Sequence, residues 1–180
     1  MLFRSRLENS RAGSLAVMEN RGDAQRYCRQ LLRGLKKEYF YVICLNAQMQ
    51  VLGDALISQG TVSEVEVYPR QVAEAVMRYN AYAVVLCHNH PGGTPYPSSH
   101  DMDVTRRLVE LCSQLSVKVL DHIIVSESQV LSMVSCGLLE LDEEAEQFRA
   151  AEPDGELLIR RRLEKQQKEG KKKTCRKGLG

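Results

Sequence analysis

Hydrophobic residues recur at helical spacing in three parts of the chain. From Asp23 to about Leu35 they return every three or four positions, which predicts an amphipathic helix with Asp23 as its N-cap. Pro69 suits the first turn of a second helix, whose apolar face continues to Tyr79. A third helix is expected after Asp101, where leucines and valines again follow this spacing.

Between these helical segments lie short apolar or alternating runs of extended character. The segments that predict strands or extended pieces are residues 39–45, 50–57, 62–67, 81–87, 117–125 and 130–134. Strands that alternate with at least three helices indicate an α/β domain. The pattern ends near Leu141, so we expect a loose segment over residues 1–22, one domain over 23–141, and a charged, disordered tail over 142–180.

Composition limits the class of protein. Apolar residues make up 43% of the 180 and charged residues 27%, which is typical of a globular domain. The net charge of +2 is unevenly spread, because residues 160–177 carry a local charge of +8 and the rest of the chain carries −6. Any attraction to nucleic acid is therefore expected in this basic tail.

Location and redox state follow from two further features. No apolar run is long enough to span a bilayer, and the N-terminus lacks the apolar stretch of a signal peptide, so we expect a cytoplasmic protein without membrane contact. None of the cysteines forms a C-x-x-C pair, which favours free thiols over disulfides or a cysteine metal site. They are Cys28, Cys44, Cys87, Cys112, Cys136 and Cys175.

The chemistry of the sequence is concentrated between residues 86 and 105. His88 and His90 stand at i and i+2 at the end of an apolar run, so a strand directs both side chains to one face. A loop rich in Gly and Pro leads to Ser98 and Asp101 at the start of a helix. Two imidazoles and a carboxylate are the protein ligands of a catalytic zinc site, although Ser98 and Asp101 also fit a helix-capping box.

These residues resemble a known motif. The pattern H-x-H, seven residues, then S-x-x-D is similar to the JAMM motif of MPN/JAB domains. The segment from His88 to Asp101, HNHPGGTPYPSSHD, is followed by Thr105 and resembles the bacterial RadC family. The stretches around residues 60–61, 68–70 and 120–125 resemble the same family. The resemblance covers about residues 25–140 and implies a mixed sheet flanked by helices, in the three-layer architecture of cytidine-deaminase-like folds.

The resemblance also implies roles for individual residues. His88, His90 and Asp101 would bind Zn²⁺, and Ser98 would stabilise an oxyanion, although it can also serve as an N-cap. Spacing does not choose a general base among the glutamates, but the place of the base in the family matches Glu38. Asp121 is a candidate hydrogen-bond acceptor for a metal-binding histidine, or else forms a structural pair with His122.

Two positions depart from the family pattern and bear on substrate contacts. Gly92 replaces the usual serine after His-Pro, and Gln71 replaces the usual acidic residue after Pro-Arg. Only about two dozen residues precede the matching region, whereas relatives commonly carry a helix-hairpin-helix-like segment there, which weakens any inference of DNA binding.

The sequence thus supports three hypotheses. The first is a zinc metalloprotease-like hydrolase that cleaves an amide or isopeptide bond in a peptide or protein. The second is a DNA-repair accessory protein that contacts nucleic acid weakly through residues 160–177. The third is a metal-binding interaction domain without catalysis.

Overall fold

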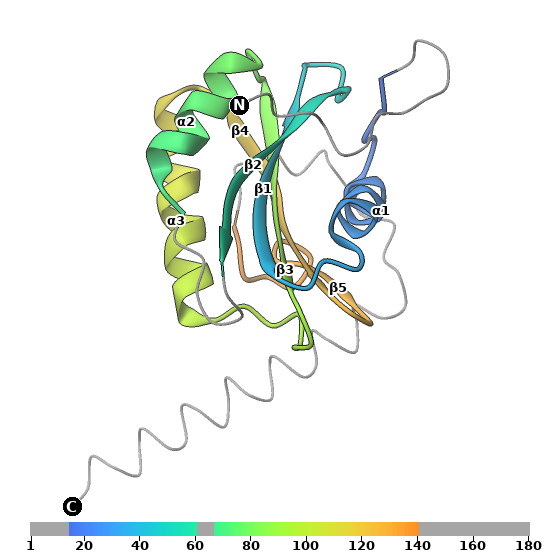
Figure 1. The fold of residues 1–180 in the computed structure, drawn as a ribbon. Coiled ribbons are helices and arrows are strands. Elements are labelled where there is room, and N and C mark those ends of the chain that lie inside the picture. Colours follow the sequence, from blue (N-terminus) through green and yellow to red (C-terminus); the bar gives the residue numbers. More distant parts are fainter. Residues whose placement is uncertain (1–14, 61–66, 141–180) are drawn as a thin grey trace, which may run out of the picture.

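The described part of the chain is a three-layer α/β domain. A computed structural model describes residues 15–60 and 67–140, which contain five strands and three helices (Figure 1). In chain order the elements are α1 (Arg21–Leu32), β1 (Glu38–Leu45), β2 (Val51–Gly60), α2 (Pro69–Arg78), β3 (Ala83–His90), α3 (Ser99–Gln114), β4 (Lys118–Ser126) and β5 (Val130–Ser132).

The strands form one mixed sheet in the order β2-β1-β3-β4-β5. Only β3 and β4 pair in parallel, and the other neighbours are antiparallel. The parallel pair requires a crossover connection, which α3 supplies. The central position of β3 agrees with its sequence, because an apolar run without alternation is typical of a strand buried on both faces.

Helices cover both faces of this sheet (Figure 1). α1 packs on one face against residues such as Ile43, Val85 and Ile123. α2 and α3 pack on the other face, where Val42 and Leu86 belong to a second apolar cluster. The two clusters use alternate residues of the same strands, as the pleat of a sheet requires. The predicted fold class is confirmed.

The start of α1 differs from the prediction in its cap. Asn20, not Asp23, is the N-cap, and its side chain accepts a hydrogen bond from the Asp23 backbone N–H. Asp23 stands at N3 and accepts in turn from the Asn20 N–H, which completes a capping box. The chain joins the core earlier than the apolar spacing indicated, because Met18 is buried and Val17 bridges to Gln50.

The predictions on cysteines and membrane spans can be compared with the described residues, whereas those on the chain ends cannot. The five cysteines of the described residues are free and buried. Among the described residues, no helix is both long and apolar enough to cross a membrane. The extended piece expected over residues 62–67 falls almost wholly outside the described residues, as do the tail over 142–180 and the first 14 residues of the N-terminal segment.

Candidate metal centre

Three elements bring the predicted site residues to one end of the sheet. Glu38 is the first residue of β1, and His88 and His90 close β3, its antiparallel neighbour. Asp101 lies in the first turn of α3, which follows β3 after the Gly/Pro loop. One ligand atom from each of these four side chains lies within 4.8 Å of the other three. The spacing in the sequence therefore corresponds to a real cluster, which we call the Glu38–Asp101 cluster.

Within the cluster the two imidazoles converge. The Nε2 atoms of His88 and His90 are 2.9 Å apart. The Asp101 carboxylate stands beside both, with Oδ1 3.4 Å from His88 Nε2 and Oδ2 3.6 Å from His90 Nε2. His88 is almost completely buried, whereas His90 lies partly open to the surface. One edge of the cluster is thus accessible from solvent.

Asp101 takes part in the helix cap and in the cluster at the same time. Its Oδ2 accepts hydrogen bonds from the Ser98 backbone N–H at 2.7 Å and from the Ser98 hydroxyl at 2.6 Å. The Ser98 Oγ accepts from the Asp101 N–H at 3.1 Å, which makes a capping box. Oδ1 remains directed toward His88. The two interpretations of Ser98 and Asp101 are therefore not alternatives, because the cap holds the carboxylate in place for the cluster.

The proton positions around His88 follow from a chain of buried hydrogen bonds. The Thr105 hydroxyl donates to the Asp101 carbonyl at 2.6 Å, so it accepts from His122 Nδ1, also at 2.6 Å. Burial lowers the pKa of His122 to about 4, so this ring is neutral and its Nε2 carries a lone pair. That Nε2 accepts from His88 Nδ1 at 2.8 Å. The Nε2 of His88 is left without a proton, facing the cluster.

His90 is oriented by the loop that follows it. Its Nδ1 donates to the Thr94 carbonyl at 2.8 Å, which turns Nε2 toward Asp101. Burial alone would lower the pKa of His90, but the nearby Asp101 carboxylate, the hydrogen bond to Thr94 and the charge of Glu38 raise it above 6.5. Burial and the neighbouring His122 hold the pKa of His88 well below 6.5. As the pH falls, therefore, His90 takes up an additional proton before His88 does.

Glu38 has the environment of a proton carrier. It lies beside Phe40, whose ring stacks on His88 with centroids 5.9 Å apart, at the edge of an apolar region. Burial raises the pKa of Glu38 above 4.5, and the charge of Asp101 adds to this against the opposite effect of His90. Burial also favours a protonated Asp101, yet the nearby His90 and His88 and the hydrogen bonds from Ser98 bring its pKa well below 3.8. The two carboxyl groups of the cluster are thus held at different pKa values, a pattern typical of sites that move protons.

Asp121 is not the acceptor of a histidine in the cluster, whereas the alternative of a buried pair with His122 holds through the His122 backbone N–H. It points to the opposite face of the sheet from His122, because adjacent residues of a strand alternate. Its carboxylate accepts from Ser132 Oγ and from the backbone N–H groups of His122 and Val134, with Arg21 3.8 Å away. The hydrogen-bond partner of His88 is His122 instead.

His122 and Thr105 are residues whose roles the sequence did not reveal. Two spacings in the sequence indicate that these residues lie on the same faces as the cluster residues. Thr105 lies four residues after Asp101, on the same face of α3. His122 pairs with Leu86 in the parallel register, so it shares a face with His88. Only the pairing of β3 with β4 shows that Thr105 and His122 belong to the same site. His100, by contrast, is exposed.

The donors present fit a metal ion. Two neutral imidazole nitrogens and an ionised carboxylate oxygen converge, and each imidazole donates its other N–H to a fixed acceptor. This arrangement of outer hydrogen bonds is typical of metal-binding histidines. Without a cation, the facing Nε2 lone pairs of His88 and His90 repel each other unless a proton lies between them. The cluster can therefore hold a metal ion through His88, His90 and Asp101, with Glu38 beside it.

A sheet between one helix and a pair of helices, with this carboxylate–imidazole cluster at the start of α3, defines a JAB-type domain. Comparison with known families agrees with this class. Residues 18–138, more than half of the chain, match the RadC-like JAB domain, and the chain belongs to this family.

Curated relatives with the name UPF0758 protein support the match. The relative from Vibrio atlanticus (strain LGP32) is 35% identical over 130 residues, which cover 68% of this chain and 58% of the relative. The relative from Pseudomonas fluorescens (strain SBW25) is 40% identical over 124 residues, covering 69% of this chain and 55% of the relative. The chain thus spans less than two thirds of the length of these curated relatives.

Proposed function

We propose that the protein is a zinc-dependent hydrolase that cleaves an amide bond in a peptide or protein. His88, His90 and Asp101 would hold the metal, and Glu38 would be the general acid/base. The observation that carries the proposal is the convergence of these four side chains from β1, β3 and α3 within 4.8 Å. A two-histidine, one-carboxylate set with one side open to solvent suits a catalytic rather than a closed structural zinc site.

When bound, zinc lowers the pKa of water and polarises an amide carbonyl. The residues supply the rest of the chemistry. Glu38 takes a proton from water and returns it to the leaving amine, and its raised pKa brings it closer to neutral pH for both transfers. The hydrogen bonds around His88 and His90 keep both Nε2 atoms directed to the cluster. Ser98 holds Asp101, and its hydroxyl must leave Oδ2 before it can stabilise an oxyanion.

Metal content tests the ligand set. Elemental analysis of the purified protein should find about one zinc per chain, and Asp101→Ala should lose it. Because Asp101 also caps α3, His90→Ala serves as a second variant outside the helix start. A folded wild-type protein that takes up no zinc would refute the ligand assignment.

The role of Glu38 is tested separately. Glu38→Gln should abolish hydrolysis of a fluorogenic peptide while one zinc stays bound, because the amide cannot accept the proton. Glu110→Gln, an exposed change of the same kind on α3, is the matched control and should retain full activity. Full activity of Glu38→Gln would exclude Glu38 as the base. A zinc-loaded wild type that cleaves no peptide would favour a non-catalytic metal domain.

A further inference from the structure

A groove borders the Glu38–Asp101 cluster on the side of α1. Its volume is about 450 Å³, within the range of pockets that hold small molecules or a few peptide side chains. The end of α1 and the turn after it form one wall, and the ends of β3 and β4 form the other. We call this cavity the α1 groove. Because His90 lines it, one imidazole belongs to both the groove and the cluster.

The backbone around the α1 groove is held by a buried side chain and two turns. Asn89 donates to the Lys37 carbonyl and accepts from the Tyr39 N–H, both at 2.9 Å, which ties β3 to the start of β1. Gly34 and Gly92 line opposite walls with φ of 74° and 68°, a left-handed conformation that glycine adopts without strain. The departure of Gly92 from the family serine therefore lies in this groove.

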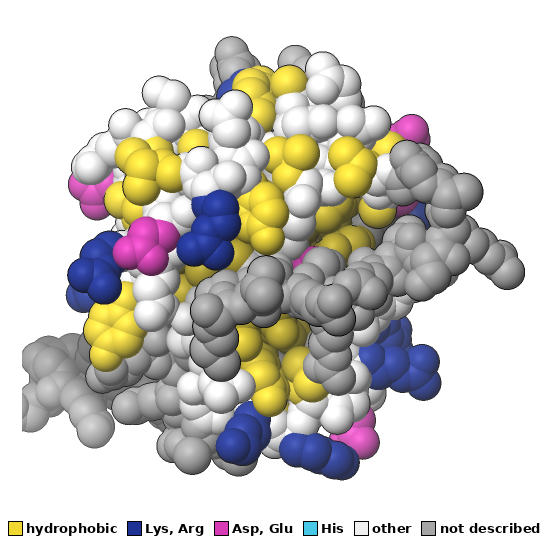
Figure 2. All heavy atoms as spheres, turned by 45° about the horizontal axis from the view of Figure 1, so that its top comes forward, with side chains coloured by type: hydrophobic (Ala, Val, Ile, Leu, Met, Phe, Trp, Pro, Cys, Tyr) yellow, Lys and Arg dark blue, Asp and Glu magenta, His cyan; other side chains and the backbone are white. Residues whose placement is uncertain are grey.

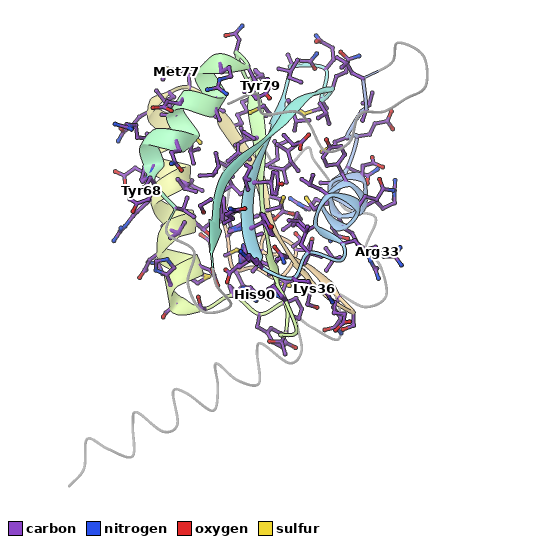
Figure 3. The ribbon with its side chains drawn as sticks, in the orientation of Figure 1. Arg33, Lys36, Tyr68, Met77, Tyr79 and His90 are labelled. Atoms are coloured by element: carbon purple, nitrogen blue, oxygen red, sulfur yellow. The ribbon has the colours of Figure 1, made fainter. Side chains whose placement is uncertain are left out.

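The α1 groove is positively charged. Arg29, Arg33 and Lys36 line it, against Glu127 as the one acidic residue among its lining. Arg29 stabilises the fold itself, because a cation in the last turn of α1 interacts favourably with the helix C-terminus. Arg33 and Lys36 are exposed, and neither forms an ion pair with any residue in 15–60 or 67–140. Figure 3 shows Lys36 next to His90 and Arg33 beyond it at the end of α1.

The composition of the groove favours a peptide over a nucleic acid. Leu32, Leu35 and Val125 add apolar lining beside the charges, which suits the stem of a side chain. A nucleic-acid backbone is a continuous row of phosphates and needs an extended basic surface. The chain outside residues 160–177 carries a charge of −6, so the groove is a local exception.

We propose that the α1 groove binds an acidic residue of the substrate, so that the preferred substrate is a peptide with a Glu or Asp close to the scissile bond. The proposal rests on the hydrolase function for the position of that bond, but the binding itself does not require cleavage. Arg33 and Lys36 would pair with the carboxylate. His90, shared by groove and cluster, would set the distance between the acidic residue and the metal.

Binding of matched peptides tests this proposal. The probe is a fluorescein-labelled octapeptide with three glutamates, compared with the same peptide carrying glutamines, by fluorescence anisotropy. The full chain with Glu38→Gln, loaded with zinc, prevents turnover. We expect about tenfold tighter binding of the glutamate peptide, because two exposed ion pairs, each weak alone, would act together. The preference should disappear in Arg33→Gln/Lys36→Gln, which removes both cations.

The control separates the groove from the basic tail. Arg70→Gln/Arg107→Gln removes the same charge from α2 and α3 on the other face of the sheet and should keep the preference. A preference that survives the Arg33/Lys36 change would place the attraction outside the groove, at the metal or in residues 160–177, and overturn the proposal. Tighter, groove-dependent binding of a single-stranded octanucleotide would overturn it in favour of nucleic acid. Loss of hydrolysis alone would concern the hydrolase proposal and leave the binding result intact.

Discussion

At the scale of single residues, the site depends on which nitrogen of each imidazole carries a proton. His88 is the clearest example. Its Nδ1–H donates to His122 Nε2, and the His122 ring is held in turn by its hydrogen bond to Thr105. His90 is fixed by one backbone carbonyl. Above the raised pKa of His90, both rings thus present a lone pair at Nε2, and each arrangement has consequences that can be measured.

Zinc affinity should depend on pH through one proton. The pKa of His90 is raised above 6.5, whereas those of His88 and Asp101 are lowered, so only His90 must lose a proton for zinc to bind. Lowering the pH below the pKa of His90 therefore weakens binding, about tenfold per pH unit between pH 5.5 and 6.5. Competition with a chromophoric chelator measures this slope. A slope near two would show that His88 is also protonated.

Thr105→Val should weaken zinc binding by about 10- to 100-fold. Without the hydroxyl, His122 Nδ1–H has no acceptor, so its proton shifts to Nε2 and the proton of His88 moves to the metal-facing nitrogen. ¹⁵N chemical shifts of His88 report this change of tautomer directly. Thr94→Val is the matched control, because only the backbone carbonyl of Thr94 contacts the site. Unchanged affinity and tautomer in Thr105→Val would show that the buried chain is merely structural.

At the scale of elements, the start of α3 links helix stability to the site. The capping box satisfies free N–H groups of the helix and holds the Asp101 carboxylate against His88 and His90. A frayed first turn would therefore move a proposed ligand. The other two proposed ligands are on β3, a central strand with a neighbour on each side.

Ser98→Ala should lower both stability and zinc affinity. Loss of the N-cap costs about 1 kcal/mol of unfolding free energy, and Asp101 Oδ2 loses its hydroxyl donor. Chemical denaturation and chelator competition measure the two effects. Ser99→Ala, one residue further on and exposed, is the control and should change little. If Ser98→Ala slowed turnover and left affinity and stability unchanged, Ser98 would act on the oxyanion instead.

At the scale of the whole molecule, the cluster joins three elements that are distant in sequence. β1, β3 and α3 each contribute, so a bound metal stabilises the folded chain over the unfolded chain.

The face in Figure 2 presents hydrophobic side chains in separate patches among polar groups. The charged groove lies at the end of the sheet where Figure 3 places His90.

Zinc should raise the thermal midpoint of the chain. Free zinc at about 100 times its dissociation constant contributes roughly 2.7 kcal/mol, which corresponds to an increase in Tm of about 10 °C for a domain of this size. Differential scanning fluorimetry with and without chelator measures it. His90→Ala should show the metal-free midpoint under both conditions. An equal increase in His90→Ala would place the zinc elsewhere in the chain.

The sequence determined much of the fold and most of the cluster. Its hydrophobic spacing predicted the three helices and the five described strands, because a helix and a sheet bury residues at different periods. The spacing from His88 to Asp101 is local, so the strand end, loop and helix start bring these side chains together with little help from the rest of the chain. The N-cap of α1 was misplaced by three residues, since Asn20 and Asp23 both satisfy capping chemistry.

Tertiary structure decided what depends on pairing between distant segments. Glu38 reaches the cluster only because β1 runs antiparallel to β3, and His122 reaches His88 only because β3 and β4 are parallel in one register. The α1 groove likewise exists only where the end of α1 meets two strand ends. Side-chain periodicity shows which face a residue occupies but not which strand lies beside it, so these contacts become visible only in the folded chain.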